Sequence, residues 1–233
     1  MKAVILVGGK GTRLRPITYE IPKPLIPVKK KPIINHLIEF FAKHGVKEVG
    51  LLASREHEDD FRRWKKTWLD ELPTDKVSIF YEEKPRGTFG GFEYLKDWAG
   101  GDQLLVSNGD DLKDFDLGDM IKAHNEDDSH ATLLLMEVPD PRKYGVPVMK
   151  GQKINEFLEK PENPPCNYIN AGLYIIEPDV MNDTDFSKEY IMFEKDIFPE
   201  LAKKGKLSGF KAVNGRWFDC GNLESWEKAM MEW

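Results

Sequence analysis

The feature of the sequence that most limits the possible folds is a run of five apolar residues, 3–7, that leads directly into a glycine-rich turn. The run has no helical or alternating period, and its length suits a buried strand of a parallel sheet. Three glycines follow within residues 8–11, and glycine lets backbone N–H groups approach an anion closely because it has no Cβ. Arg13 and Lys23 can supply the opposing charge. The stretch therefore predicts a polyphosphate-binding loop.

Two common phosphate-binding loops are excluded by the residues themselves. The dinucleotide fold would need a third glycine at position 14, where Leu14 stands, and the P-loop would need a closing Gly-Lys-Ser/Thr after a longer spacing. The segment that continues to Pro32 holds five prolines and so cannot be one continuous helix. A loop of this length is usually functional or disordered, and its spaced apolar residues favour an ordered one. The alternative is a tight strand–helix turn with incidental charges.

The order of the expected elements predicts the fold class. Strands are expected at Lys2–Val7, Val46–Ala53, Val77–Tyr81 and Gln103–Ser107, and helices at Ile33–His44, Glu56–Leu69 and Phe92–Ala99. Strands that alternate with helices indicate an α/β protein with a doubly wound, mostly parallel sheet, in which ligands bind at the carboxyl ends of the strands. The second half is less regular, and its expected strands, including Tyr144–Met149 and Lys153–Leu158, suggest antiparallel pairing.

Acidic residues at predicted strand ends indicate a metal site. Asp110 and Asp111 follow a buried strand, and Mg²⁺ prefers oxygen ligands, often one or two carboxylates together with phosphate oxygens. Asp219 could be a second ligand. The alternative for each is a turn or a helix cap without metal. Glu159-Lys160 and Asn170-Ala171-Gly172 could recognise hydroxyl and phosphate groups, or could be a surface ion pair and a turn.

Composition narrows the class of partner. The net charge of −6 argues against a nucleic-acid binder, whereas the seven basic residues and one acid between positions 8 and 32 suit a small anionic ligand. No apolar run approaches the ~20 residues that span a bilayer, and we expect neither a signal peptide nor membrane binding. The two cysteines, Cys166 and Cys220, lie far apart and favour free thiols in a reducing cytoplasm over a disulfide.

The motifs together resemble those of the sugar-1-phosphate nucleotidyltransferases, also called NDP-sugar pyrophosphorylases. The resemblance covers nearly the whole chain, and mannose-1-phosphate guanylyltransferases are most similar, with heptose-phosphate guanylyltransferases and muramic-acid-phosphate uridylyltransferases also similar. The matching segments occur in the family's order: Gly8–Leu14, Pro22–Leu25, Gly87-Thr88, Asn108–Asp110, Lys143–Val146, Glu159–Pro161, Asn170–Tyr174, Phe193–Pro199 and Trp217–Gly221.

The resemblance implies a Rossmann-like, glycosyltransferase-A-like fold with a smaller antiparallel sugar-binding part. It assigns catalysis to Arg13, Lys23 and Asp110, and Mg²⁺ binding to Asp110 and Asp219. The nucleotide would be bound by Leu6, Gly8, Gly9, Gly11, Thr12, Arg13, Lys23, Glu82, Gly87, Asn108 and Gly109. The sugar phosphate would be bound by Tyr144, Gly145, Glu159, Lys160, Asn170 and Gly172, with Lys160 on its phosphate.

The implied reaction joins an NTP to a sugar 1-phosphate and releases pyrophosphate by in-line attack on the α-phosphorus. It needs alignment and charge neutralisation rather than a protein nucleophile. Guanine is favoured because Glu82 could accept hydrogen bonds from its N–H edge, while uridylyl, thymidylyl or cytidylyl transfer and a non-catalytic nucleotide-sugar sensor are alternatives. Lys84 and Arg86 depart from the usual Glu-Pro-Leu-Gly-Thr segment and leave the base open.

The domain organisation that we expect is one nucleotidyltransferase domain over residues 1–233, without a C-terminal β-helix domain. Its nucleotide-binding half would cover about 1–125 and its sugar-binding half about 126–233. A homo-oligomer is left open.

Overall fold

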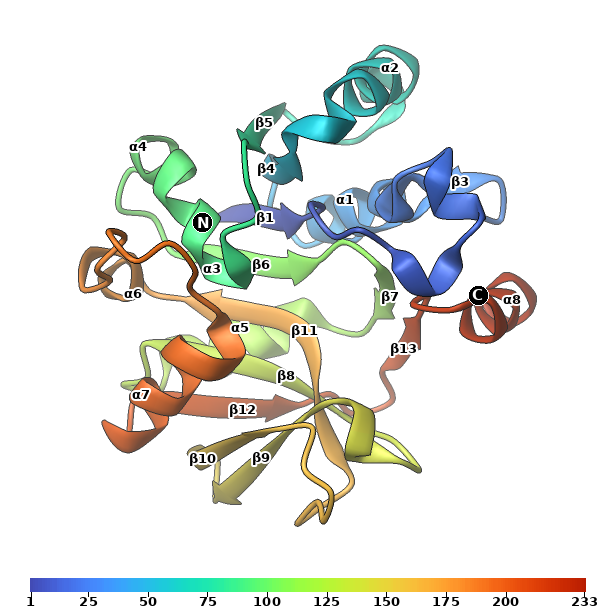
Figure 1. Ribbon diagram of the computed structural model, residues 1–233. Helices are drawn as coiled ribbons and strands as arrows, with labels where there is room; N and C mark the ends of the chain where they lie inside the picture. Colours follow the sequence, from blue (N-terminus) through green and yellow to red (C-terminus); the bar gives the residue numbers. More distant parts are fainter. The chain divides into compact units, whose positions relative to one another are not determined.

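The computed structural model describes all 233 residues, and they form two compact units (Figure 1). The first unit consists of residues 1–85, 107–114 and 216–233, and the second of residues 86–106 and 115–215. Each unit draws on distant parts of the chain. The expected halves, about 1–125 for the nucleotide and about 126–233 for the sugar, describe function and stay a prediction.

The first unit is built on three parallel strands joined by two helices. The strands lie in the order β5-β4-β1, and Val49 pairs with Ala3 on one side and Val77 on the other. Trp64 Nε1 donates to Asn35 Oδ1 at 2.7 Å, which holds the two helices together. The predicted strands and helices are confirmed here as β1 (Lys2–Leu6), α1 (Ile33–Lys43), β4 (Glu48–Ser54), α2 (Glu58–Trp68) and β5 (Lys76–Glu82).

The long proline-containing loop between β1 and α1 is ordered. Leu14 is fully buried and Ile26 nearly so, whereas Ile21 is 39% exposed. The loop winds through three 3₁₀ turns and a short hairpin: η1 (Thr12–Leu14), η2 (Ile17–Tyr19), η3 (Lys23–Leu25), β2 (Pro27–Val28) and β3 (Lys31–Pro32).

A second, smaller pair of strands completes the first unit and was not expected from the sequence. β7 (Asp111–Asp114) pairs antiparallel with β13 (Arg216–Asp219), so that Asp111 lies opposite Asp219. The C-terminal helix α8 (Leu223–Glu232) starts at a capping box: the Asn222 side chain accepts from Ser225 N, and the Ser225 hydroxyl accepts from Asn222 N.

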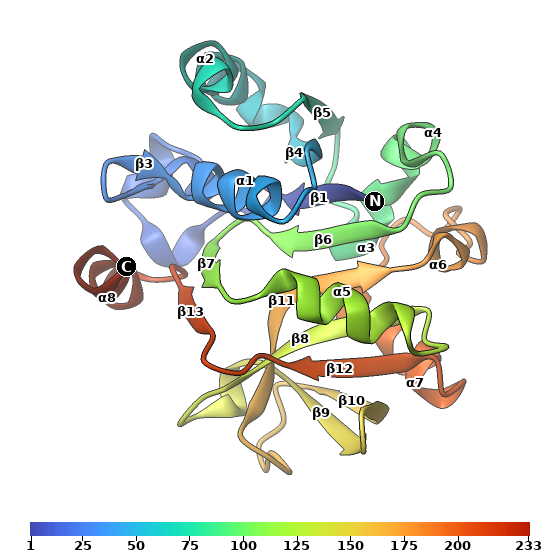
Figure 2. The ribbon, with the colours of Figure 1, turned by 180° about the vertical axis from the view of Figure 1, so that it is seen from behind.

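The second unit combines parallel and antiparallel strands. Its strands lie in the order β11-β8-β12-β10-β9; β8 and β12 are parallel, and the other neighbours are antiparallel. Helices α5 and α7 lie on opposite faces of these strands, as comparison of Figures 1 and 2 shows. The strands are β8 (Ala131–Glu137), β9 (Gly145–Lys150), β10 (Lys153–Glu159), β11 (Tyr168–Ile176) and β12 (Leu207–Lys211).

Two helices of the second unit differ from the expectation. The helix expected at Phe92–Ala99 is broken into a 3₁₀ segment and a short α-helix. The helical stretch over residues 193–203, for which the sequence analysis gave no helix, opens with a π-helical turn. The helical segments are α3 (Gly87–Gly90), η6 (Gly91–Leu95), α4 (Lys96–Ala99), α5 (Leu117–Asn125), η7 (Pro141–Lys143), α6 (Pro178–Asn182), η8 (Phe193–Ile197) and α7 (Phe198–Lys203).

These observations confirm the predicted α/β class. The strands β5, β4 and β1 of the first unit are parallel, and the second unit has one parallel pair, β8–β12, among antiparallel ones. A further strand, β6, spans Leu104–Asn108. None of the helices has the length and apolar character needed to cross a membrane. Cys166 and Cys220 are both free thiols, as predicted.

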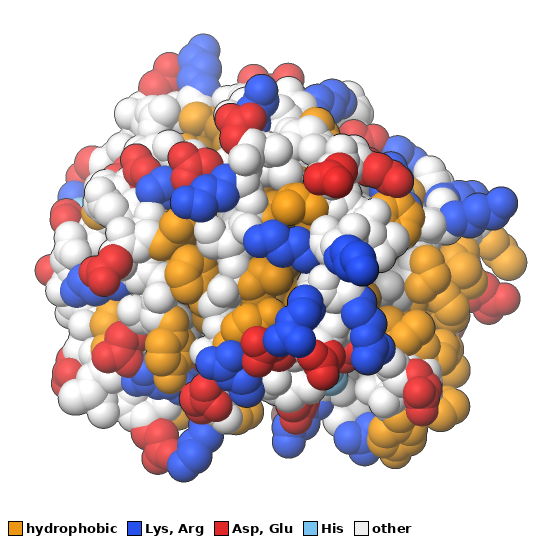
Figure 3. Space-filling view, turned by 90° about the horizontal axis from the view of Figure 1, so that it is seen from above, with side chains coloured by type: hydrophobic (Ala, Val, Ile, Leu, Met, Phe, Trp, Pro, Cys, Tyr) orange, Lys and Arg blue, Asp and Glu red, His pale blue; other side chains and the backbone are white.

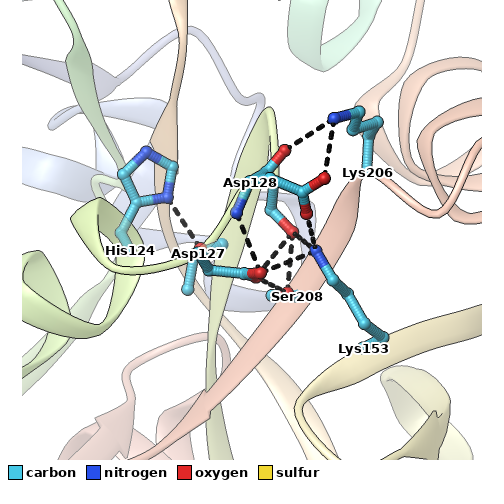
Figure 4. Close-up of polar contacts among 8 residues, drawn as sticks. His124, Asp127, Asp128, Lys153, Lys206 and Ser208 are labelled. Atoms are coloured by element: carbon cyan, nitrogen blue, oxygen red, sulfur yellow. Dashed lines mark hydrogen bonds and ion pairs between the residues drawn. The ribbon is translucent and has the colours of Figure 1, made fainter.

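A polar cluster anchors the loop after α5 to the strands of the second unit (Figure 4). Asp127 accepts hydrogen bonds from Ser129 Oγ and Ser208 Oγ and forms an ion pair with Lys153 at 2.8 Å. Asp128 is bound by Lys153 at 2.7 Å and by Lys206 at 3.0 Å. Every charged side chain of the cluster has a partner of opposite charge within it, so the role of the cluster is structural.

The surface carries charges of both signs. Figure 3 shows one face, on which Lys and Arg side chains lie among Asp and Glu side chains. On α2, for example, Arg62 pairs with Glu58 and Asp59. Such exposed pairs contribute little to stability.

Candidate active site

The glycine-rich turn follows β1 and has the backbone geometry that its glycines permit. Gly11 adopts φ 58°, and a Cβ atom there would lie 2.7 Å from Thr18 Cγ2. Its carbonyl accepts from Thr18 Oγ1 at 2.8 Å and from Leu14 N at 2.9 Å. No heavy atom lies within 4 Å of the position of a Cβ atom at Gly9. The turn is thus fixed at Gly11 and open at Gly9, where a ligand can approach the backbone.

The residues of the first unit that the sequence analysis predicted to bind the nucleotide lie around this turn. Gly109 N donates to Leu6 O at 3.0 Å, which brings the segment after β6 against the end of β1. A Cβ atom at Gly8 would lie 3.4 Å from Glu82 Oε2, so the buried carboxyl group of Glu82 lies directly beside the turn. Thr12 begins the first 3₁₀ turn and is exposed, and Asn108 ends β6.

Lys23 and Asp110 form an ion pair at the carboxyl end of β6. The Lys23 side chain is buried. Lysine is seldom buried without a partner, and here the partner is Asp110 Oδ2. Burial alone would raise the pKa of Asp110, but the charge and hydrogen bond of Lys23 lower it below its usual value, and Lys113 and Arg13 add to this. Asp110 is therefore held as a carboxylate.

The pairing of β7 with β13 brings Asp219 to the same place. Cys220 N donates to Asp110 O at 3.1 Å, and a Cβ atom at Gly221 would lie 2.6 Å from Asp219 Oδ1 and 3.0 Å from Arg13 Nη2. Burial raises the pKa of Asp219, and the negative charge of Asp110 raises it further, while Lys23 and Arg13 oppose the increase. The structure thus gathers four predicted residues, Arg13, Lys23, Asp110 and Asp219, beside the open turn.

A buried polar network supports this group, and the sequence analysis did not identify it. Lys113 is fully buried and forms an ion pair with Asp111, and it also donates to Ser107 Oγ at 3.2 Å. Trp217 Nε1 donates to the other Asp111 oxygen at 3.1 Å. The sequence does hold a signal for the Asp111–Lys113 pair, because side chains two residues apart on a strand lie on the same face of the sheet. The network fixes β13, which carries Asp219, and β7, which begins directly after Asp110.

The two acidic residues can accept a divalent cation. Nowhere do three or more His, Cys, Asp or Glu side chains come together to hold a metal ion. Asp110 and Asp219 nevertheless provide hard oxygen donors whose mutual repulsion a cation would relieve, as the raised pKa of Asp219 indicates. Mg²⁺ commonly takes one or two carboxylates and completes its shell with phosphate and water oxygens, so this donor pair fits it.

The predicted sugar-site residues belong to the second unit, and several are in direct contact. Asn170 Oδ1 accepts from Gly172 N at 3.1 Å, and its amide donates to the Tyr174 hydroxyl at 3.1 Å. These bonds hold the irregular part of β11, where Gly172 has φ 66°. The Asn170 side chain is therefore fixed by its own strand.

The remaining sugar-site residues lie where β9 and β10 pair. Glu159 is the register partner of Gly145, Lys160 N donates to Tyr144 O at 3.1 Å, and Lys160 Nζ lies 3.1 Å from the Glu159 carboxylate. Lys160 has φ 51°, an uncommon conformation for a residue with a side chain. The sequence motif Glu-Lys-Pro thus forms a sharp corner that presents both charged groups.

The segment that departs from the family pattern is bound within the second unit. Arg86 donates to Phe186 O at 2.7 Å and to Lys188 O at 3.2 Å, and it pairs with Glu93. Gly87 has φ 84°, and a Cβ atom there would lie 2.3 Å from Ile191 O. The Arg86 charge is therefore committed to neighbouring carbonyl groups and to Glu93.

Taken together, the site has the features of a phosphate-binding class of protein. An open glycine turn follows a parallel strand, and two basic side chains and two carboxylates lie beside it. The comparisons with known proteins agree with this class. The family described as nucleotidyl transferase matches residues 2–233, so the chain belongs to that family, as its motifs predicted.

Similar proteins carry names that include a sugar phosphate. The mannose-1-phosphate guanylyltransferase catalytic subunit beta of Danio rerio is 37% identical over 225 residues, which is 95% of this chain and 61% of that protein. The chain thus spans about three fifths of the length of this relative.

Two solved structures have the same fold. A Bacillus anthracis protein in complex with sucrose superposes with a TM-score of 0.89 at 26% identity, covering 99% of this chain and 94% of that one. HddC from Yersinia pseudotuberculosis, complexed with GMP-PN, gives 0.80 at 26% identity, covering 99% of this chain and 98% of that one.

Proposed function

We propose that the protein is a Mg²⁺-dependent nucleotidyltransferase that condenses an NTP with a sugar 1-phosphate to give an NDP-sugar and pyrophosphate. The observation that carries this proposal is the gathering of Arg13, Lys23, Asp110 and Asp219 beside the open turn at Gly9. A protein that only sensed nucleotide-sugars would have no need to keep a pair of carboxylates that repel each other.

The mechanism needs positioning and charge neutralisation. The exposed Arg13 guanidinium is free to bind the departing pyrophosphate, and the Lys23 ammonium neutralises charge near the α-phosphate. Asp110 and Asp219 would hold Mg²⁺, which supplies a positive charge that stabilises the phosphate oxygens during transfer. The backbone of residues 8–11 would bind the phosphates. The sugar phosphate is itself the nucleophile, so no protein nucleophile is required.

Mannose 1-phosphate and GTP are the substrates that we favour. Relatives at 36–37% identity are named mannose-1-phosphate guanylyltransferases, and HddC was solved with a guanine nucleotide analogue. The Glu82 carboxyl group beside Gly8 can accept hydrogen bonds from the N–H edge of guanine. Other sugar 1-phosphates and other bases are the alternatives.

The test is pyrophosphate release from a panel of NTPs and sugar 1-phosphates, with Mg²⁺ and with EDTA. We expect GTP with mannose 1-phosphate to be the fastest pair and EDTA to stop turnover. Arg13→Ala and Asp110→Asn should each reduce kcat by about 10²–10³-fold. Exposed residues away from the site, Arg62→Ala and Asp119→Asn, are matched controls. Binding of a nucleotide-sugar without any pyrophosphate release would instead support the sensor.

A further inference from the structure

Thr18 lies seven residues after Gly11 and is not among the residues predicted to bind the nucleotide, yet its side chain contacts the glycine turn directly. Thr18 Oγ1 donates to the Gly11 carbonyl at 2.8 Å. A Cβ atom at Gly11 would lie 2.7 Å from Thr18 Cγ2 and 3.2 Å from Thr18 Cβ. Thr18 thus both binds the turn and occupies the space that the missing Cβ atom leaves.

Thr18 is held in a fixed position within its own part of the loop. It is the middle residue of η2, in which Tyr19 N donates to Pro16 O at 3.0 Å. Its side chain is half-buried, and a β-branched side chain has little freedom about χ1. The hydroxyl group is therefore presented to Gly11 by a backbone that is itself hydrogen-bonded.

The Thr18 hydroxyl helps to set the orientation of the peptide group between Gly11 and Thr12. The Gly11 carbonyl oxygen has two lone pairs, which accept from Thr18 Oγ1 and from Leu14 N, the latter at 2.9 Å. This peptide bond is trans, and a planar trans peptide points its N–H opposite to its carbonyl group. The direction of the Thr12 N–H is therefore set in part by Thr18.

The contact lies beside the charged groups of the proposed active site. A Cβ atom at Gly11 would also lie 3.3 Å from Lys23 Cβ, so Thr18 and Lys23 both pack against the same residue of the turn. Lys23 is the ion-pair partner of Asp110. A change at Thr18 therefore alters the backbone of the turn at the point where it meets Lys23.

We propose that Thr18 is a positioning residue for the phosphates of the NTP: its hydroxyl holds the Gly11–Thr12 peptide in the orientation in which the turn binds them. This inference rests on the proposed function. Because the single hydroxyl proton of Thr18 is already donated to Gly11, Thr18 acts through the turn and not by contact with the nucleotide. Groups that are fixed before binding lose less freedom when the ligand binds, so this preorganisation increases affinity.

The experiment measures the Kd of inorganic tripolyphosphate, GTP and guanosine by calorimetry, and KM for both substrates from pyrophosphate release. Thr18→Val removes the hydroxyl at similar volume. We expect it to raise Kd for tripolyphosphate and KM for GTP by about tenfold, which corresponds to one hydrogen bond. The Kd of guanosine and KM for the sugar 1-phosphate should stay within about twofold, whereas a general loosening of the fold would weaken every ligand.

Thr67→Val is the matched control. The Thr67 hydroxyl also donates to a backbone carbonyl, that of Arg63 at 3.0 Å, and it lies on the exposed side of α2. The control variant loses the same kind of hydrogen bond away from the turn. It should therefore bind tripolyphosphate and GTP as the wild type does.

Thr18→Ser and Thr18→Ala give an independent arm if Thr18→Val does not fold. Both lack Cγ2 and differ only in the hydroxyl, so Thr18→Ser should bind tripolyphosphate about tenfold more tightly than Thr18→Ala. Equal Kd values for this pair, or a wild-type Kd in folded Thr18→Val, would overturn the inference alone. The expected Thr18 effect without any pyrophosphate release would overturn the proposed function alone, and a wild type that binds neither tripolyphosphate nor any NTP would overturn both.

Discussion

Replacing Gly221 by alanine tests whether Arg13 and Asp219 act through their mutual placement. The new Cβ atom would lie 2.6 Å from Asp219 Oδ1 and 3.0 Å from Arg13 Nη2, whereas ordinary contacts begin at 3.4 Å. The carboxylate must then move by about 0.8 Å and the guanidinium by about 0.4 Å. Both are ends of side chains, and the φ of Gly221 lies outside the positive range. The fold should therefore accept the substitution.

The cost should appear in catalysis. A displacement of about 1 Å in a positioning group can cost about 10²-fold in rate, or about 2.7 kcal/mol of transition-state stabilisation. We expect kcat for pyrophosphate release to fall by about this factor while Tm stays within about 1 °C. Gly118→Ala is the matched control, because its Cβ atom would lie 3.0 Å from Asp116 Oδ1 in the second unit. A wild-type kcat for Gly221→Ala, or a rate loss that merely follows a loss of folded protein, would refute the reasoning.

Three further predictions concern the second unit and the thiols. Gly145→Ala should lower the free energy of unfolding by about 1–3 kcal/mol in urea titrations, because its Cβ atom would lie 2.3 Å from Phe157 Cζ; an unchanged midpoint would contradict the packing argument. For Asp127, burial would raise the pKa, but hydrogen bonds from Lys153, Ser208 and Ser129 lower it below its usual value. The folded-state pKa is thus the lower one, so the stabilisation is present above pH ~4 and is lost as the pH falls. Asp127→Asn should therefore cost about 1–2 kcal/mol at pH 7 and progressively less on acidification, and a pH-independent difference in denaturation would count against it. Burial raises the pKa of the Cys220 thiol to about 12, so a thiol reagent should modify only the half-buried Cys166 in the folded protein and both cysteines in denaturant; two rapidly reacting thiols in the native state would show that Cys220 is accessible.

The parts of the fold that follow local patterns were predictable. The apolar runs of β1 and β4 and the helical spacing of α1 reflect burial on one face or both, and these patterns depend only on nearby residues. The loop could be predicted as ordered because its apolar residues need a core. The gathering of Asp110 with the glycine turn followed from topology, since parallel strands end at one edge of the sheet.

The pairing of β7 with β13 could not be predicted in the same way. The two strands have four residues each and contain Asp and Lys, which have low strand propensity. Lys113 is buried because Asp111 pairs with it, and the pairing in turn requires Trp217 from a strand more than 100 residues later. Only the tertiary structure makes these polar residues compatible with a core. Asp219 therefore looked like an ordinary acid before a turn.

The proposed reaction needs residues for phosphate transfer and residues that bind the sugar. The charged groups proposed to act on the phosphates of the NTP and on Mg²⁺, Arg13, Lys23, Asp110 and Asp219, all belong to the first unit. The groups proposed to bind the sugar hydroxyls, including Asn170 and Glu159, belong to the second, as does Lys160, which is proposed to bind the phosphate of the sugar. Phosphate chemistry is common to every sugar substrate, whereas the pattern of hydroxyls differs. Substitutions in the second unit should therefore alter KM and the choice of sugar, and substitutions in the first unit should alter kcat for all sugars alike.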